Sequence, residues 1–463
     1  MIQFGTDGWR AIIAQDFTFE NVKIVSQAIA DYLKRKSKGR SSVVIGYDRR
    51  FLSREFSEAA GCVLAANKIK VVLSDTDVPT PAISFHCAKS KFDLGIMMTA
   101  SHNPAQFNGL KIKTSEGGSA DKSVTNSVEA LLNKSKLKFM ELSEAKRKNL
   151  LEIKDLKKDY ISFFKTFVDL KKIRRLKLKV IVDTMYGSGD NFVEKILGPC
   201  SVKIDYLHNE HNPSFGGIHP EPVESNLKEL ISIIKKSDYD MGVVLDGDAD
   251  RIAMIDNKGN YINAQVILPL LAIHMIKNRG IRAGIGKTVV GSDVIDKVAL
   301  SLGVACYETP VGFKYLSNLF KKNLIAIGGE EAGGIGFKGY IPERDGSCAF
   351  LLLLEMLAFE KTNFPKLLSR FYKQYGRYFY ARTSVSVKSI KKSLSEMKLP
   401  KQILGKDILR INPMDGVKLI TDSFWLMFRK SGTEPIVRVY AEGKSQKITD
   451  RLVDLGRKMI LSL

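Results

Sequence analysis

The amino-acid sequence predicts an α/β protein of four consecutive domains, the last of them α+β. Short apolar segments that end in a turn or an acidic residue alternate with amphipathic helical segments through most of the chain. The chain has 463 residues, whereas a single hydrophobic core seldom grows past about 250–300 residues. The segment 376–463 holds strand-like stretches with fewer helical stretches between them, which is typical of an α+β unit.

Five apolar segments are predicted as buried strands, because β-branched and apolar residues follow one another in them without strict alternation. They are 42–48, 70–77, 93–101, 179–187 and 241–248. Helical stretches lie between them. In the stretch 18–36 the apolar residues form one stripe, and Thr18 can cap the first turn. Strands that alternate with helices predict sheets with a parallel core.

Three changes in composition divide the chain into domains. The stretch 132–158 is polar and rich in lysine, which predicts a linker or a connecting helix. The turn signal Asp-Asn-Lys-Gly at 256–259 and the segment 372–381 mark two further boundaries. The predicted domains cover 1–140, 155–257, 258–371 and 376–463.

The composition is that of an ordinary globular chain, with 44% hydrophobic and 26% charged residues. The first ten residues include Asp7 and Arg10 and lack the layout of a secretion signal. The longest apolar run, 348–359, is interrupted by Glu355 and is shorter than the roughly 20 residues that span a bilayer. Five scattered cysteines without a CxxC pair predict reduced thiols. We therefore expect a cytoplasmic protein without a membrane segment.

The chain is strongly basic, with 72 basic and 50 acidic residues and a formal net charge of +22. Such an excess attracts nucleic acids, anionic lipids or small phosphorylated substrates. The basic runs at 34–40 and 171–179 lack the interleaved aromatic residues that stack on bases. We therefore expect small phosphorylated partners, no nucleic acid and no membrane.

Three carboxylates stand at alternate positions directly after the strand 241–245. Asp246, Asp248 and Asp250 lie on a loop, where they can converge on one hard cation such as Mg²⁺. A bare acidic turn is disfavoured, because three unpaired carboxylates repel one another without a cation. A calcium EF-hand is excluded, because its sixth and twelfth positions require Gly and Glu, whereas Arg251 and Asn257 stand here. The loop is a predicted metal site.

A second motif, Thr-Ala-Ser-His-Asn-Pro at 99–104, also follows a predicted strand. The pair Asn103 and Pro104 forces a turn and leaves the Ser101 hydroxyl at the strand end. The GxSxG pattern of a hydrolase nucleophile is absent. An ordinary turn serine is the alternative. A phosphorylated Ser101, however, would supply the oxygen ligand that three carboxylates leave missing on a metal ion.

Two glycine-containing loops complete the set of motifs. The loop 328–334 holds Glu330 and Glu331 but lacks the spacing of a nucleotide P-loop, so its carboxylates suit hydrogen bonds from sugar hydroxyls. The loop 428–435 offers two cations, two hydroxyls and glycine amides, which is typical of a phosphate-binding nest. Arg438 follows on the next predicted strand.

These four motifs, in this order, resemble those of the alpha-D-phosphohexomutase superfamily, which includes phosphoglucomutases and phosphomannomutases. The resemblance runs from Gly-Thr-Asp-Gly-Trp-Arg at 5–10 to Arg-Lys-Ser-Gly-Thr-Glu-Pro at 429–435. It implies four domains around a central cleft, of which the first three are related α/β units with mixed sheets.

The resemblance also implies roles for individual residues. Ser101 is the expected phosphoserine and, with Asp246, Asp248 and Asp250, a ligand of Mg²⁺. The other expected catalytic residues are Lys111, His102, Arg10 and Arg251. The expected substrate-binding residues are Glu330 and Lys314, with Arg429, Ser431, Gly432, Thr433 and Arg438 as the clamp for the phosphate that is not transferred.

The implied reaction interconverts hexose 1-phosphate and hexose 6-phosphate through a hexose 1,6-bisphosphate, which also serves as activator. Lys111 is the first candidate for the general base, provided that nearby Mg²⁺ and Arg251 lower its pKa, and His102 is the second. Glucose is the expected hexose, because the Gly-Glu-Glu form of the sugar-binding loop and the Pro-Val-Gly-Phe-Lys segment at 310–314 resemble phosphoglucomutases. Mannose is a further expected hexose, because Ala332 replaces the usual serine of the sugar-binding loop and leaves the sugar preference open. A metal-dependent phosphatase and a non-catalytic sugar-phosphate binding protein are the alternatives. The chain is expected to be a monomer or a homodimer.

Overall fold

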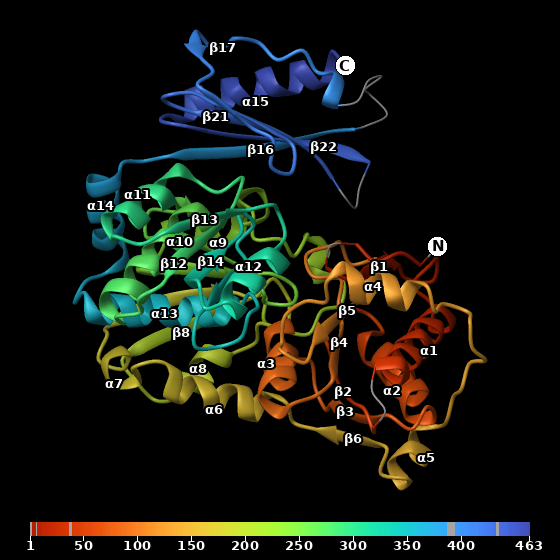
Figure 1. Cartoon of the computed structure of the whole chain (residues 1–463). Helices are drawn as coiled ribbons and strands as arrows, with labels where there is room; N and C mark the ends of the chain where they lie inside the picture. The colour runs from red at the N-terminus through yellow and green to blue at the C-terminus, as the bar shows by residue number, and fades with distance from the viewer. Residues whose placement is uncertain (1, 6, 37–38, 387–393, 432–434) are drawn as a thin grey trace.

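The computed structural model describes residues 2–5, 7–36, 39–386, 394–431 and 435–463 (Figure 1). The strands of this part of the chain form four sheets of four to six strands and one two-stranded ribbon. Each of the four larger sheets belongs to one domain, and the domains follow one another along the chain.

The first sheet has six strands, and helices cover it. In spatial order its strands are β1 (Trp9–Ile12), β5 (Phe107–Thr114), β4 (Leu94–Met98), β2 (Ser42–Tyr47), β3 (Lys70–Ser74) and β6 (Leu151–Lys154). Its helices are α1 (Phe19–Lys36), α2 (Ser53–Ala66), α3 (Thr80–Ser90), α4 (Lys122–Glu129) and α5 (Leu142–Arg147). Thr18 caps α1 as predicted, since its Oγ1 accepts a hydrogen bond from Asn21 N at 3.2 Å.

The second and third sheets have five and four strands. The second sheet runs β11 (Tyr261–Ile262), β10 (Ile252–Asp256), β9 (Met241–Leu245), β7 (Leu178–Asp183) and β8 (Val202–Leu207), with helices α6 (Lys157–Phe167), α7 (Leu170–Ile173), α8 (Phe192–Leu197) and α9 (Lys228–Lys235). The third runs β13 (Cys306–Thr309), β12 (Gly284–Thr288), β14 (Ile325–Gly329) and β15 (Ile335–Phe337), with helices α10 (Ala264–Ile273), α11 (Asp293–Ser301), α12 (Phe313–Lys321), α13 (Gly346–Phe359) and α14 (Phe364–Tyr375).

One strand pattern recurs in these three sheets. The strands β2, β7 and β12 each lie between two parallel partners, which are the next two main strands of their domain. The third strand of each domain (β4, β9 or β14) then pairs antiparallel with a fourth (β5, β10 or β15). The prediction of three related domains with mixed sheets is confirmed.

The last sheet is antiparallel and differs from the other three. Its strands are β16 (Phe379–Ser386), β22 (Ile436–Gly443), β21 (Trp425–Lys430), β20 (Val417–Ile420) and β19 (Arg410–Asn412). Helix α15 (Gln446–Leu461) packs on the sheet, and β17 (Gln402–Ile403) and β18 (Lys406–Asp407) form the ribbon. Figure 1 shows this α+β domain, in blue, beside the third domain, in green.

Two segments contribute to sheets beyond the predicted domain limits. The expected linker 132–158 contains β6, which pairs in parallel with β3 of the first sheet. Strand β11 lies past residue 257 but pairs with β10 of the second sheet. A domain limit at 140 therefore leaves β6 out of the first domain, and a limit at 257 leaves β11 out of the second. The predicted limits miss these strands because short edge strands give only a weak pattern in the sequence.

Hydrophobic packing joins the domains. One cluster of buried residues is continuous through the second and third domains and includes residues of α3 from the first. A smaller cluster joins Val289 and Val290 of the third domain to Trp425, Met427 and Tyr440 of the last. No helix of the described residues is long and apolar enough to cross a membrane. All five cysteines are free.

Candidate active site

Three of the predicted motifs occupy the same position in their domains. Ser101 lies between β4 and β5, the Asp246–Asp250 loop lies between β9 and β10, and Glu330 lies between β14 and β15. Each is the connection from the third strand to the fourth in the recurring pattern. The three loops meet: Ser101 Oγ of the first loop donates to Asp246 Oδ2 of the second, and Arg251 and Gly334 form a β-bridge between the second and third domains.

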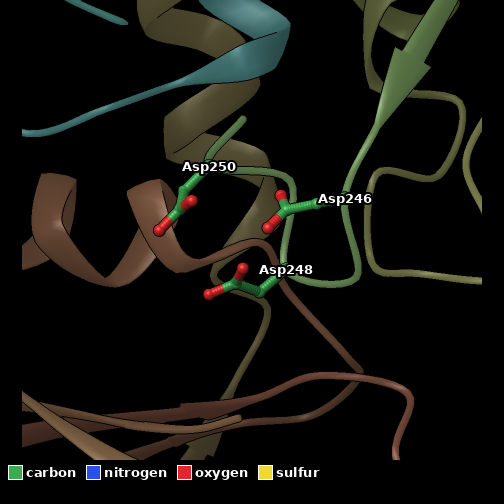
Figure 2. A group of neighbouring side chains, drawn as sticks. All are labelled: Asp246, Asp248 and Asp250. Carbon is green, nitrogen blue, oxygen red and sulfur yellow. The ribbon is translucent and has the colours of Figure 1, made fainter. Parts of the chain in front are cut away.

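The three aspartates form a buried cluster. Asp246, Asp248 and Asp250 each offer a carboxylate oxygen within 4.8 Å of the others, and none of the three residues is exposed to solvent (Figure 2). Burial and the two neighbouring carboxylates raise the pKa of Asp246 well above its usual value. Asp248 Oδ1 and Asp250 Oδ1 have no hydrogen-bond partner among the described residues. Buried carboxylate oxygens without a hydrogen bond fit a hard divalent cation.

The Ser101 hydroxyl points at this cluster. Ser101 Oγ donates a hydrogen bond to Asp246 Oδ2 at 3.0 Å, and His102 Nδ1 lies 3.4 Å from Ser101 Oγ. Ser101 has φ 53°, a left-handed conformation that is uncommon for serine. Gly247 permits this contact between loops, because a Cβ at that position would lie 2.5 Å from Ser101 O. The predicted pairing of the serine with the aspartates is thus present in the structure.

Lys111 lies among carboxylates. Its Nζ is 2.8 Å from Asp248 Oδ2, 3.0 Å from Asp250 Oδ2 and 2.9 Å from Asp7 Oδ2. Burial lowers the pKa of Lys111, but the three carboxylates outweigh burial and raise it above the usual value. The predicted lowering of the Lys111 pKa depends on a cation bound to the aspartates and stays a prediction, since the three carboxylates around Nζ act in the opposite direction.

The remaining predicted catalytic residues lie around the cluster. Arg251 Nε is 3.8 Å from Asp250 Oδ1 and 4.0 Å from Asp246 Oδ2, and Arg10 Nη1 donates to Asn103 Oδ1 at 2.8 Å. Burial, together with Arg251 and Arg10, lowers the pKa of His102 well below its usual value.

Arg344 and Asp7 belong to the site but were not identified from the sequence. Arg344 Nη2 contacts Asp7 Oδ2 at 2.7 Å and Asp250 Oδ2 at 2.8 Å, and its Nη1 contacts Glu330 Oε2 at 3.0 Å. Arg344 therefore joins the predicted sugar-binding glutamate to the metal loop. In the sequence, Asp7 is marked as a site residue only by its place in the Gly-Thr-Asp-Gly-Trp-Arg motif. Arg344 stands in a short loop before α13, and no predicted motif includes it.

The predicted phosphate clamp lies in the last domain. Arg429 and Arg438 are cross-strand partners on β21 and β22, and Ser431 N donates to Ile436 O at 2.9 Å. Gly432 and Thr433 lie outside the described residues. Arg429 Nε contacts Asp415 Oδ2 at 2.6 Å, and the same oxygen accepts a hydrogen bond from Val311 N of the third domain.

Lys314 lies near this contact between domains. It follows Val311 at the start of α12, and Asp415 is among the charges that act on it. Burial and Lys122 of the first domain lower the pKa of Lys314. The structure thus places Lys314 toward the clamp rather than in contact with the aspartates.

Glu221 links the clamp domain to the metal loop and was also missed. Arg382 Nη2 of β16 donates to Glu221 Oε1 at 2.7 Å, and Arg251 Nη1 lies 3.7 Å from the same oxygen. Burial raises the pKa of Glu221, but Arg251, Arg382 and Arg438 outweigh burial and lower it. Four charged groups therefore lie close to the aspartates: Glu221 and Arg251 of the second domain, and Arg382 and Arg438 of the last.

Models of one protein family match nearly the whole chain. Phosphoglucomutase/phosphomannomutase alpha/beta/alpha domains I, II and III match residues 1–139, 158–259 and 263–375, and the C-terminal domain of the family matches 383–457. The chain belongs to the phosphoglucomutase/phosphomannomutase family. The resemblance drawn from the sequence is confirmed, and so is the prediction of an intramolecular phosphotransferase. The phosphatase and the non-catalytic binding protein are disfavoured.

Relatives and solved structures agree with this family. A phosphoglucomutase/phosphomannomutase of Thermococcus kodakarensis is 30% identical over 99% of this chain and 98% of its own length. A phosphoglucosamine/phosphogalactosamine mutase of Sulfurisphaera tokodaii is 29% identical over 99% and 98%. A crystal structure from Thermus thermophilus, described as a phosphomannomutase, is 30% identical, covers 99% of both chains and has a TM-score of 0.88.

Proposed function

We propose that this mutase interconverts hexose 1-phosphate and hexose 6-phosphate through a phosphorylated Ser101 and a hexose 1,6-bisphosphate. The observation that carries this proposal is the hydrogen bond from Ser101 Oγ to Asp246 Oδ2 at 3.0 Å, inside a buried trio of carboxylates. A serine in this position can carry a phosphoryl group whose charge is balanced within the site.

Asp246, Asp248 and Asp250, together with an oxygen on Ser101, would hold Mg²⁺. All of these ligands are oxygens, which this cation prefers. When bound, the ion supplies positive charge next to the phosphoryl oxygens. Arg10 and Arg251 add two further cations at the edge of the cluster.

The chemical step is an exchange of oxygen partners at phosphorus. The bond from phosphorus to Ser101 Oγ breaks, a bond to the free sugar hydroxyl forms, and the hydroxyl proton passes in net terms to Oγ. His102 Nδ1 lies 3.4 Å from Oγ and can transfer this proton, whereas Lys111 has no contact with Ser101 among those that the structure describes. Geometry therefore favours His102 over Lys111 for the proton, and Lys111 orients the carboxylates.

Reversal of the same step with the other phosphate gives the isomeric monophosphate and restores phospho-Ser101. The intermediate must turn round between the two steps, so each phosphate occupies the clamp in turn. Arg429, Ser431 and Arg438, with Gly432 and Thr433, would hold that phosphate. Glu330 would accept hydrogen bonds from sugar hydroxyls, and Lys314 would face the substrate from the third domain.

Glucose phosphate is the proposed main substrate and mannose phosphate a second one. Ala332 removes a hydroxyl from the sugar-binding loop, and a neutral hydrogen bond contributes about 1 kcal/mol, which is too little to exclude either hexose. Five free cysteines suit a reducing compartment, and we place the enzyme in the cytoplasm.

A coupled assay tests the proposal. Glucose 1-phosphate, mannose 1-phosphate and glucosamine 1-phosphate are each supplied with and without Mg²⁺ and the matching bisphosphate, and the 6-phosphate product is measured. We expect turnover that requires Mg²⁺ and is highest with glucose 1-phosphate. Release of inorganic phosphate in place of the isomer would refute the mutase.

A further inference from the structure

Arg50 holds the loop that carries Ser101. Its Nη2 donates to Ser101 O at 2.5 Å and Asn103 O at 2.7 Å. Its Nη1 donates to Pro104 O at 2.9 Å and Phe107 O at 3.0 Å, and its Nε donates to a carboxylate, Asp48 Oδ2, at 3.2 Å. A guanidinium has five N–H donors, so the full donor capacity of Arg50 is used.

The same network holds the other side of Ser101. Ser101 N donates to Thr99 Oγ1 at 2.8 Å, and Thr99 Oγ1 donates to Asp48 Oδ2, the oxygen that Arg50 Nε contacts. The backbone N–H and C=O of Ser101 are therefore tied to one ring of hydrogen bonds. The uncommon φ of Ser101, 53°, requires surroundings that hold the backbone in place, and this ring of hydrogen bonds holds it.

The guanidinium is closed off from water. The Arg50 side chain is 0% exposed, and its Cζ lies 4.8 Å from the centre of the Phe215 ring, which comes from the second domain. Hydrogen bonds in such a dry site are stronger and less exchangeable than on the surface. The loop is therefore held from within the first domain and covered by the second.

We propose that Arg50 is a positioning residue that sets the direction of Ser101 Oγ for phosphoryl transfer. The inference rests on the proposed function of Ser101. Arg50 touches neither Oγ nor the aspartate trio among the contacts that the structure describes, and acts through the carbonyl groups of the loop. Lysine cannot replace it, because an ammonium has three donors at a single point and cannot reach four carbonyls.

The test compares Arg50→Lys with Arg49→Lys in the full chain. Arg49 has the same charge and is nearly buried, but it contacts Asp77, Asp190 and Asn209 O instead of the Ser101 loop. Each protein is mixed with glucose 1,6-bisphosphate and Mg²⁺, and mass spectrometry follows the gain of one phosphoryl group on the Ser101 peptide. A phosphorus–oxygen bond of the sugar breaks, one to Oγ forms, and the Oγ proton passes to the sugar oxygen.

We expect Arg50→Lys to slow phosphorylation and kcat by about 100-fold, the order of loss for a group misplaced by about 1 Å. The final extent of phosphorylation and KM should stay within about twofold of the parent, and Arg49→Lys should stay within about threefold in rate. A merely structural role would instead reduce the final extent, because part of the protein would be inactive. An unchanged rate in Arg50→Lys would overturn the inference.

A second variant covers a failure of Arg50→Lys to fold. Thr99→Val keeps the shape but removes the hydroxyl that joins Ser101 N to Asp48. It should give the same loss of rate in a protein that still folds, with a melting temperature lowered by about 5 °C because Ser101 N loses its acceptor. A parent rate in Thr99→Val, or unfolding of both variants, would also overturn the inference. If the parent chain itself gains no phosphoryl group, the proposed function fails; if the parent is phosphorylated and Arg50→Lys matches its rate, only the inference fails.

Discussion

Replacement of Arg344 by alanine tests how the site is held together. Arg344 is 7% exposed and forms ion pairs with Asp7, Asp250 and Glu330 at 2.7–3.0 Å. Removal of one partner of a buried ion pair typically costs about 3–5 kcal/mol, because the other charge stays buried without compensation. The second and third domains share one core, and for a unit of about 150–250 residues 1 kcal/mol corresponds to about 2–4 °C in melting temperature. We therefore expect Arg344→Ala to lower the melting temperature by about 10 °C.

Calorimetry in EDTA and in Mg²⁺ checks this magnitude and its cause. A cation on the aspartate trio would compensate Asp250, so the loss should be smaller in Mg²⁺ than in EDTA. The control is Arg370→Ala, because Arg370 is 53% exposed and lies 3.6 Å from Glu360, a surface pair worth at most about 1 kcal/mol. A melting temperature for Arg344→Ala in EDTA within about 2 °C of the parent would refute the reasoning.

Three further predictions concern the nucleophile, the clamp and the contact between the last two domains. Ser101→Ala should reduce mutase turnover at least about a thousandfold with little change in melting temperature, and near-normal turnover would contradict its role. Arg429→Ala should raise KM about tenfold with kcat within about threefold, since a charge-assisted hydrogen bond contributes about 1.5–3 kcal/mol; a lower kcat at unchanged KM would contradict the clamp. Burial and Asp293 raise the pKa of Glu442 to about 7. The Glu442 carboxyl therefore binds its proton more tightly in the native state than in the unfolded state. The resulting stabilisation is about 3 kcal/mol; it is present below the unfolded pKa near 4.5 and is lost as pH rises through about 7. Glu442→Gln should remove this loss, so its melting temperature should fall less than that of the parent between pH 5 and 8; equal slopes would argue against it.

The strands and the chemical motifs were readable from local sequence. The segment 42–48 became β2 (Ser42–Tyr47), and 241–248 became β9 (Met241–Leu245) followed by the aspartate loop. Such segments are readable because a buried strand requires a run of apolar residues, and a metal loop requires oxygen ligands at close spacing. The roles of Arg50, Glu221 and Arg344 were not readable, since each contacts partners far away in the sequence.

The sequence by itself indicated which groups carry the chemistry: a serine and three aspartates at the ends of predicted strands, a glutamate in a glycine-rich loop, and a basic loop. Only the tertiary structure decided that the first three motifs stand at one equivalent connection in three repeated sheets, so that they face one another. It also decided the surroundings of Lys111, whose Nζ lies within 3.0 Å of three carboxylates. The physical reason is distance along the chain. A strand pattern or a ligand spacing involves residues within a short segment, whereas electrostatic and hydrogen-bond partners come from distant segments that only the fold brings together.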